Sequence, residues 1–200
     1  MHQPVLEGRG RRPLDLPPVP AYSSRMLDRY LAFLQKNPEP AILDLGPTCG
    51  ANISFFAERG GLLCVCDFML RFAGDESKGH GPGTVGGILD YRPGSFDGIH
   101  LWDIPDHLDN RALLEIAQRC RTLLKKHGRV MALASASPDP EPFENYLVVN
   151  SNLSVTLRES QAHRYPYLYR SNRDIEAAMK PLEQCASFVC MNGWREFLFR

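Results

Sequence analysis

Short apolar runs alternate with helical patterns along this chain. Ala41–Leu45 and Leu62–Cys66 are mostly apolar stretches of the length of a buried parallel strand. Between them, Ile53, Phe56 and Ala57 recur at helical spacing, so we expect one helical face to pack against the sheet. A strand, a tight turn and a helix in this order begin a doubly wound sheet, whose ligands bind beyond the carboxyl ends of the strands.

The same alternation continues on both sides of this unit. Apolar residues at helical spacing predict helices over about 24–36 and 110–126, with Gly128 closing the second. Ser24 can cap the first of these helices, and Asp109 or Asn110 the second; Ser171 or Asn172 can cap a third helix that contains Ile175 and Met179. Gly98–Trp102 and Arg129–Ala134 are predicted as further buried strands.

The end of the chain carries the strongest turn signal. Asn192-Gly193 lies between two apolar runs, 187–191 and 194–199, and Asn-Gly is a preferred sequence for a tight hairpin turn. The sheet is therefore expected to finish in an antiparallel pair. The pattern as a whole predicts an α/β fold: a doubly wound, Rossmann-like three-layer sandwich, with a mostly parallel sheet and an antiparallel C-terminal hairpin.

Two segments carry less regular patterns. Glycines through residues 74–87 predict one turn of helix at Phe68–Ala73 and then a flexible loop in place of a full crossover helix. Residues 153–158 alternate between apolar and polar, as in a half-buried strand. Tyrosines at 165, 167 and 169 continue the alternation. We expect them to pack in the core or to lie on the surface; lining a pocket for an acceptor substrate is the less favoured alternative.

Composition limits the classes of function. The 200 residues suit one domain, which we place at residues 21–200, after a flexible, proline-rich arm at residues 1–20. A formal net charge of zero gives no indication of nucleic acid or of an acidic membrane surface as a partner. No stretch approaches the roughly 20 apolar residues of a membrane span. Six scattered cysteines form no disulfide framework, which favours a reducing, cytoplasmic location.

Three kinds of ligand-binding turn are considered for Gly46-Pro47-Thr48-Cys49-Gly50, which follows the first strand. A P-loop is disfavoured, because Gly46 and Gly50 are one residue closer together than the two glycines of a P-loop, and no lysine follows Gly50. A dinucleotide turn needs a glycine where Thr48 stands, and Pro47 has no N–H to offer a pyrophosphate. The residues favour a cofactor without phosphate, held by shape and a few polar contacts. A turn that binds nothing is the structural alternative.

Residues 44–50, D-L-G-P-T-C-G, resemble the first motif of class I S-adenosylmethionine-dependent methyltransferases, D/E-x-G-x-G-x-G. They depart from it where threonine replaces the middle glycine and where proline stiffens the turn. The resemblance implies that Asp44, Gly46, Thr48 and Gly50 contact the cofactor, S-adenosylmethionine. In the order of its motifs, the resemblance extends over about residues 22–200.

Acidic residues follow the later strands. Asp67 lies 21 residues after the first glycine of the turn, near the position that binds the ribose in dinucleotide folds; capping of the next helix is the structural alternative. By the resemblance, Asp67 and Phe68 contact the cofactor, Asp90 reaches the adenine amino group, and Trp102 lies at the cofactor edge. Carboxylates of Asp67, Asp90 and Asp103 at strand tips would make the cleft acidic, which suits a sulfonium cation.

Methyl transfer is an in-line displacement at the sulfonium methyl. The protein mainly supplies alignment, together with a base where the acceptor must lose a proton. His107, beyond the tip of the strand Gly98–Trp102, is the first candidate base, and Asp103 is the second. His100 lies inside that strand, where a satisfied core histidine is the expectation. Metal-ligand spacing is absent from the sequence, so we expect no metal site.

Three hypotheses about function follow. The first is S-adenosylmethionine-dependent methyl transfer to a small-molecule or protein acceptor that the sequence does not identify. The second is a non-catalytic scaffold or binding protein of the same fold, suggested by Thr48, Pro47 and the shortened crossover. The third, an NAD(P)-dependent oxidoreductase, is disfavoured by the turn and by the terminal hairpin.

Overall fold

The computed structural model describes residues 21–74, 81–138, 145–159, 165–190 and 193–200. The predicted N-terminal arm at residues 1–20 lies outside these ranges. The same is true of residues 75–80 within the glycine-rich segment.

A six-stranded sheet forms the middle layer, with strand order β3-β2-β4-β5-β9-β8. β2, β3, β4 and β5 are parallel, whereas β9 pairs antiparallel with both β5 and β8. The predicted fold class, with its antiparallel C-terminal hairpin, is therefore confirmed. The strands are β2 (Ala41–Asp44), β3 (Leu62–Val65), β4 (Phe96–Trp102), β5 (Leu124–Ser135), β8 (Gln184–Val189) and β9 (Trp194–Phe199).

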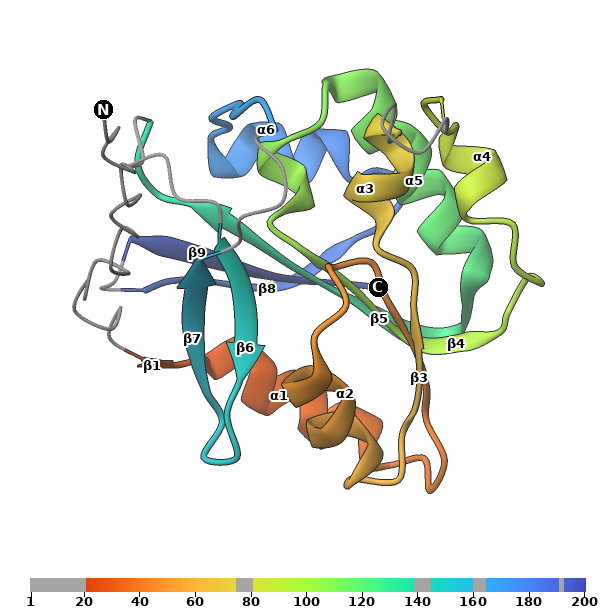
Figure 1. Ribbon diagram of the computed structural model, residues 1–200, viewed down its shortest axis with the longest axis vertical. Helices are drawn as coiled ribbons and strands as arrows, with labels where there is room; N and C mark the ends of the chain where they lie inside the picture. Colours follow the sequence, from red (N-terminus) through yellow and green to blue (C-terminus); the bar gives the residue numbers. More distant parts are fainter. Residues whose placement is uncertain (1–20, 75–80, 139–144, 160–164, 191–192) are drawn as a thin grey trace, which may run out of the picture.

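Helices cover both faces of this sheet (Figure 1). One face carries α1 and α2, and the other carries α3, α4, α5 and α6. A separate apolar core fills the space on each side. The helices are α1 (Arg25–Leu34), α2 (Gly50–Ala57), α3 (Phe68–Ala73), α4 (Val85–Ile88), α5 (Asn110–Leu123) and α6 (Asn172–Ala178).

The caps explain where these helices begin. The side chains of Ser24, Asp109 and Ser171 each accept a hydrogen bond from the first turn of α1, α5 and α6, respectively. Ser171 and Asp174 form a reciprocal capping box. These local signals lie in the sequence, and the predicted helix starts agree with the structure.

The buried face of α2 differs from the predicted one. Asn52, Phe55 and Phe56 are buried, whereas Ile53 and Ala57 are exposed. The reason is a tertiary hydrogen bond pair: the Asn52 amide donates to the carbonyl oxygen of Leu147 at 2.9 Å, and its oxygen accepts from the N–H of Val149 at 2.9 Å. A polar side chain paired in this way is stable in a buried position, which sets the rotation of the helix.

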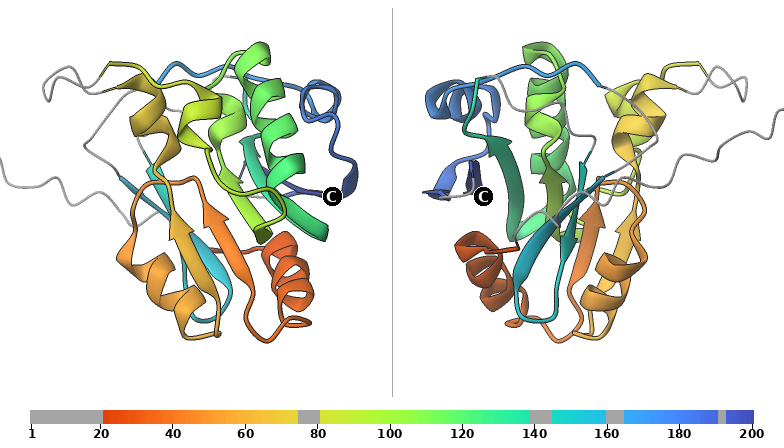
Figure 2. Two further views of the ribbon diagram at one scale, coloured as in Figure 1. Left: turned by 90° about the vertical axis from the view of Figure 1, so that its right-hand side faces the viewer. Right: turned by 60° about the vertical axis from the view of Figure 1, so that its left-hand side comes forward.

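That pairing partner belongs to a second sheet, which the sequence did not predict. It is antiparallel, has the order β1-β7-β6, and consists of β1 (Tyr22–Ser23), β6 (Asn145–Val149) and β7 (Ser154–Glu159). The hairpin of β6 and β7 lies on the same side of the main sheet as α1 and α2 (Figure 2). Of these strands, only β7 was expected.

The boundary between α5 and β5 is also displaced from its predicted place. The helix ends at Leu123 instead of near residue 126, and the strand begins at Leu124 instead of Arg129. Leu124 pairs with Phe96 and Arg129 with Gly98, so four residues of β5 stand opposite one residue of β4. Residues 125–128 therefore form a bulge between the helix and the regular part of the strand.

The connection from β3 to β4 is short, as predicted, but contains more helix than expected. α3 has the predicted bounds. Within the part expected to be loop, Val85–Ile88 form the helical turn α4, capped by the Thr84 side chain. None of the described helices is long and apolar enough to cross a membrane.

Candidate active site at the carboxyl edge of the sheet

The tips of β2, β3 and β4 meet at one edge of the sheet. Asp44 at the end of β2 pairs in register with His100 of β4 and with Val65 of β3. Parallel strands therefore deliver Asp44, Asp67 and Trp102 to the same edge, as the sequence pattern predicted.

The glycine turn after β2 is organised by Asp44. Its Oδ1 accepts a hydrogen bond from the N–H of Gly46 at 2.9 Å and another from the indole Nε1 of Trp102 at 2.5 Å. Only 2% of Asp44 is exposed, so this carboxylate shapes the turn from beneath and presents no surface to a ligand.

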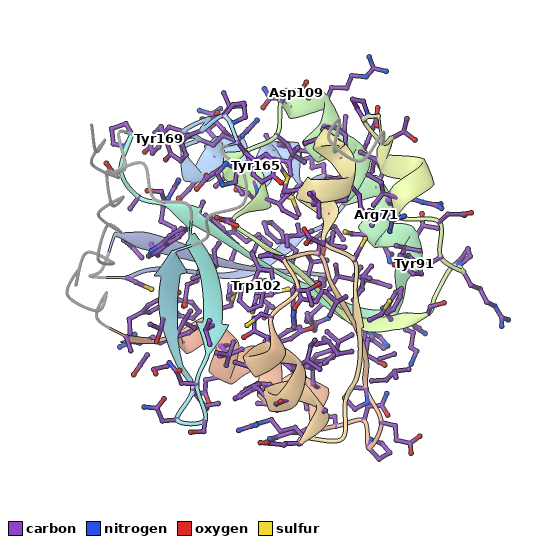
Figure 3. All side chains as sticks on the ribbon, viewed as in Figure 1. Arg71, Tyr91, Trp102, Asp109, Tyr165 and Tyr169 are labelled. Carbon is purple, nitrogen blue, oxygen red and sulfur yellow. The ribbon has the colours of Figure 1, made fainter. Side chains whose placement is uncertain are left out.

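Trp102 covers the first glycine of the turn. Its backbone is in the left-handed region, with φ of 51°, which turns the chain sharply at the end of β4. A Cβ on Gly46 would lie 2.5 Å from Cδ1 of the indole, so no other residue fits at position 46 without displacing Trp102. The tryptophan is 4% exposed and belongs to the core on the α1 and α2 side (Figure 3).

The other half of the turn is open. Pro47, Thr48 and Gly50 are exposed, and a Cβ built on Gly50 would meet no atom within 4 Å. A ligand at this edge therefore has room above Thr48 and Gly50, but not above Gly46. The sequence indicated the turn correctly, but could not show that a tryptophan 56 residues further along covers one half of it.

Asp67 and Phe68 stand at the tip of β3 in different environments. Asp67 is half-buried, has a left-handed backbone with φ of 44°, and makes no capping hydrogen bond to α3. The structural alternative for Asp67, helix capping, is therefore not supported. Phe68 is 0% exposed and stacks on Phe72 at 5.4 Å between ring centroids, so it forms part of the floor beneath the edge.

Asp90 is not brought to this edge with the others. It lies in the loop between α4 and β4, is exposed, and forms an ion pair with Arg119 of α5 at 3.6 Å. Ile88 is the last residue of α4, and Asp90 follows it in an irregular connection to β4. Of the three carboxylates expected at this edge, Asp67 and Asp103 remain. Asp67 follows β3 and Asp103 follows β4, the strands on either side of β2.

Asp103 and His107 form a pair directly after β4. The 3-10 helix η2 (Ile104–Asp106) turns the chain so that His107 Nε2 lies 3.4 Å from Asp103 Oδ2. His107 Nδ1 lies 3.0 Å from the carbonyl oxygen of Pro166. Burial by itself would lower the pKa of His107, but the hydrogen bond and charge of Asp103 outweigh it, and the pKa is raised. Because both ring nitrogens face acceptors, this arrangement favours the imidazolium form.

Asp106 is a titratable residue of this site that the sequence did not single out. Its Oδ2 accepts a hydrogen bond from the N–H of Ser135 at 2.6 Å, whereas its buried Oδ1 has no partner within the described part of the chain. Burial is the main reason that the pKa of Asp106 is raised to about 7, with the charge of Asp103 adding to it. The sequence shows an aspartate beside a histidine, but it does not show that this carboxylate is buried.

An extended segment crosses the edge above these residues. We call residues 165–170 the tyrosine strap. The N–H of Leu168 donates to the carbonyl oxygen of Asp106 at 2.7 Å, and the Tyr165 ring lies 6.1 Å from that of His107 (Figure 3). Burial, and then the charge of Asp67, raise the pKa of Tyr165 to about 12. Tyr165 thus lies within electrostatic reach of both sides of the edge, which alternation in the sequence did not reveal.

Two buried arginines fix this strap. The Arg170 guanidinium donates to the carbonyl oxygens of Pro105 and Leu108, both at 2.5 Å, and to Oδ1 of Asn110 at 2.9 Å. Arg195 of β9 donates to the carbonyl oxygen of Arg170 at 2.6 Å and to that of Ser135 at 2.5 Å. These charge-assisted bonds join the strap, η2 and β5 into one unit.

His100 is a core residue, but it is not satisfied as expected. Its side chain is 0% exposed and lies between the rings of Tyr30, Phe56 and Trp102. Both of its nitrogens lack a hydrogen-bond partner in the described residues, and Nδ1 lies 3.9 Å from Asp44 Oδ2. It lies beneath the edge and has no access to a ligand. No group of three or more His, Cys, Asp or Glu side chains among the described residues is arranged to hold a metal ion.

This architecture is that of a known class of proteins. The chain has the fold of the class I S-adenosylmethionine-dependent methyltransferases. A SAM-dependent methyltransferase from Methanosarcina mazei is similar in structure with a TM-score of 0.54 and 10% sequence identity, over 88% of this chain and 96% of that one. An S-adenosylmethionine-dependent methyltransferase from Clostridium acetobutylicum gives a TM-score of 0.53 and 12% identity, over 88% and 90% of the two chains. No protein-family model matches the sequence, and no curated protein matches it.

Proposed function

We propose that this protein transfers a methyl group from S-adenosylmethionine to an acceptor bound next to Asp103 and His107. The observation that carries the proposal is the position of this acid–base pair directly beyond β4, at the same edge of the sheet as the glycine turn that follows β2. In doubly wound folds this edge is where ligands bind.

The residues at the edge fit a nucleoside cofactor in part. Thr48 and Gly50 would face it, since the space above Gly50 is open, and Asp67 would accept hydrogen bonds from ribose hydroxyls. Asp44, Gly46, Phe68 and Trp102 would support these residues from below without direct contact, because they are buried. The proposed site does not include Asp90, because its exposed carboxylate pairs with Arg119 of α5.

The cofactor, when bound, would supply an electrophilic methyl group on a sulfonium. The protein's own contribution would be alignment and a proton acceptor. His107 is held as a hydrogen-bond donor by Pro166 and Asp103, so the group left to take a proton from the acceptor is the Asp103 carboxylate, whose side chain is 27% exposed. His107 would then position that carboxylate and stabilise its charge.

Titration calorimetry with S-adenosylhomocysteine tests the cofactor assignment. We expect micromolar, one-to-one binding to the wild-type protein and no heat with NAD. Asp67→Ala should weaken the binding at least tenfold. Asp90→Ala is the matched control, since it removes an exposed carboxylate that pairs with α5, and it should bind like the wild type. Equal losses in the two variants, or binding of NAD instead, would contradict the assignment.

One observation favours a second candidate function, a non-catalytic binding protein of the same fold. Trp102 covers Gly46 and occupies Oδ1 of Asp44, so half of the turn is closed by the protein's own side chain. A folded wild-type protein that gives no heat with either S-adenosylhomocysteine or NAD would support this candidate over methyl transfer.

A further inference from the structure

A basic cavity lies at the opposite, amino-terminal edge of the sheet. It has a volume of about 350 Å³ and lies where the end of α5, the start of β5 and Arg200, the residue after β9, come together. Five cationic side chains and one carboxylate contribute to its lining: Arg121, Lys125, Lys126, Arg129, Arg200 and Glu183. The whole chain has equal numbers of acidic and basic residues, so this is a local accumulation of positive charge.

The bulge at the start of β5 builds one wall of this cavity. Residues 125–128 loop out opposite Asp97, and His127 has a left-handed backbone with φ of 75°. In a regular continuation of the helix or the strand, these residues would follow the element's axis. The bulge turns the basic sequence Lys125-Lys126-His127 toward the cavity instead.

Two of the five cations already have a carboxylate partner. Lys125 Nζ lies 2.7 Å from Asp97 Oδ2, and Arg200 Nη2 lies 3.1 Å from Glu183 Oε2. The carboxylates of Asp97 and Glu183 are thus each already paired with a cation.

The other three cations have no carboxylate partner within the described part of the chain. Arg129 donates only to main-chain carbonyl oxygens, of His127 and Gly128, and lies over the ring of Phe33. Arg121 and Lys126 are exposed at the rim and form no ion pair with a described residue. The C-terminal end of α5 offsets about half an elementary charge, which is small against three uncompensated cations.

We propose that this cavity binds a small molecule carrying two or three phosphate groups. Arginine guanidinium groups match phosphate geometry, and several cations around one hollow suit a multiply charged anion. The volume lies at the lower end of small-molecule sites, about 300–1,000 Å³. A local basic hollow on a chain without net charge fits a small ligand better than a nucleic acid, which would need a basic stripe.

Calorimetry with inorganic tripolyphosphate at about 150 mM salt, where long-range attraction is screened, provides the test. We expect saturable one-to-one binding. The double variant Arg121→Ala/Lys126→Ala should weaken it at least tenfold, and its fold should be retained because both residues are exposed. The control Arg111→Ala/Arg173→Ala also removes two exposed positive charges, from the first turns of α5 and α6, and should stay within twofold of the wild type.

Two further ligands separate the sources of phosphate. Equal affinities for pyrophosphate and for a nucleoside diphosphate would show that the cavity recognises the phosphates alone. Tighter binding of the nucleoside diphosphate would support a nucleotide as the ligand of the same cavity. The proposal is overturned by an absence of tripolyphosphate binding, by more than one site per chain, or by equal losses in both double variants. It is also overturned if a single-stranded oligonucleotide binds more tightly and displaces tripolyphosphate. Because the cavity and the candidate active site lie at opposite edges, none of these results decides the methyltransferase proposal.

Discussion

At the carboxyl edge of the main sheet, three charged side chains are buried among partners from the same chain, whereas at the amino edge two exposed cations stand at the rim of a cavity. Asp44, Arg170 and Arg195 each form hydrogen bonds with neighbouring backbone groups or with indole or amide side chains. Arg121 and Lys126 at the other edge have no such partners in the described residues. The first arrangement fixes a geometry, and the second leaves charge available to a ligand.

This difference separates structural charge from charge available for binding. Burying a guanidinium or a carboxylate is costly unless its hydrogen bonds are satisfied, so removal of a well-paired one should be felt mainly in stability. An exposed cation contributes little to folding, so its removal should be felt mainly in ligand affinity. Three substitutions at the carboxyl edge test this contrast against the affinity measurements proposed for the amino edge.

The largest effect is expected from Arg170→Ala, which removes the anchor of the tyrosine strap. The carbonyl oxygens of Pro105 and Leu108 would lose their donors, and hydrogen bonds to a charged group contribute about 1.5–3 kcal/mol each. We expect a loss of about 3 kcal/mol in the free energy of unfolding, measured with urea. Arg173→Ala, an exposed arginine three residues away, is the control and should change stability by less than about 0.5 kcal/mol. A loss of similar size in both variants would show that the strap is not held in this way.

A somewhat smaller effect is expected from Gly46→Ala, which places a methyl group against the Trp102 indole. Overpacking of this kind costs about 1–3 kcal/mol, because the tryptophan must move and its bond to Asp44 must lengthen. Gly50→Ala is the matched control in the same turn, since open space surrounds its Cβ position, and it should be neutral or slightly stabilising. Urea denaturation and tryptophan fluorescence measure both variants. An unperturbed Gly46→Ala protein would mean that Trp102 does not cover this half of the turn.

The smallest effect, and a pH-dependent one, is expected from Asp106→Asn. The folded protein holds a proton on Asp106 up to about pH 7, whereas the unfolded chain releases it near the ordinary value of 3.8, so stability falls as the pH rises between these values. At about 1.4 kcal/mol per pKa unit, and allowing for relaxation around the charge, we expect the wild type to lose about 2 kcal/mol more than Asp106→Asn between pH 5 and 8. The asparagine oxygen can still accept from Ser135.

Two further groups define the control for this measurement. The raised pKa of His107 also makes stability fall as the pH rises. The stabilisation from the protonated His107 is complete below the ordinary histidine pKa and is lost as the pH rises through the raised pKa of the folded state. The Asp106→Asn variant keeps this contribution. Asp109→Asn keeps a good helix cap at an exposed position and should follow the wild-type profile. Parallel profiles for all three proteins would show that Asp106 is ionised in the folded state at neutral pH.

Local patterns in the sequence determined the elements and their order. Apolar runs predicted the four parallel strands, the capping residues predicted the starts of three helices, and the two apolar runs around Asn192-Gly193 predicted the antiparallel end of the sheet. The turn at residues 46–50 and the position of Asp67 after β3 were likewise visible, since parallel strands bring their tips to one edge. These features depend on spacing and residue type within a few turns of the chain.

Only the tertiary structure decided which of those residues are accessible. The rotation of α2 depends on Asn52 meeting β6, and the closure of half the turn depends on Trp102. Asp90 lies away from the edge, in the loop between α4 and β4. Asp106, the tyrosine strap and the basic cavity likewise arise where segments distant in sequence meet. The physical reason is that burial and hydrogen-bond partners depend on long-range contacts, which periodicity within one segment does not specify.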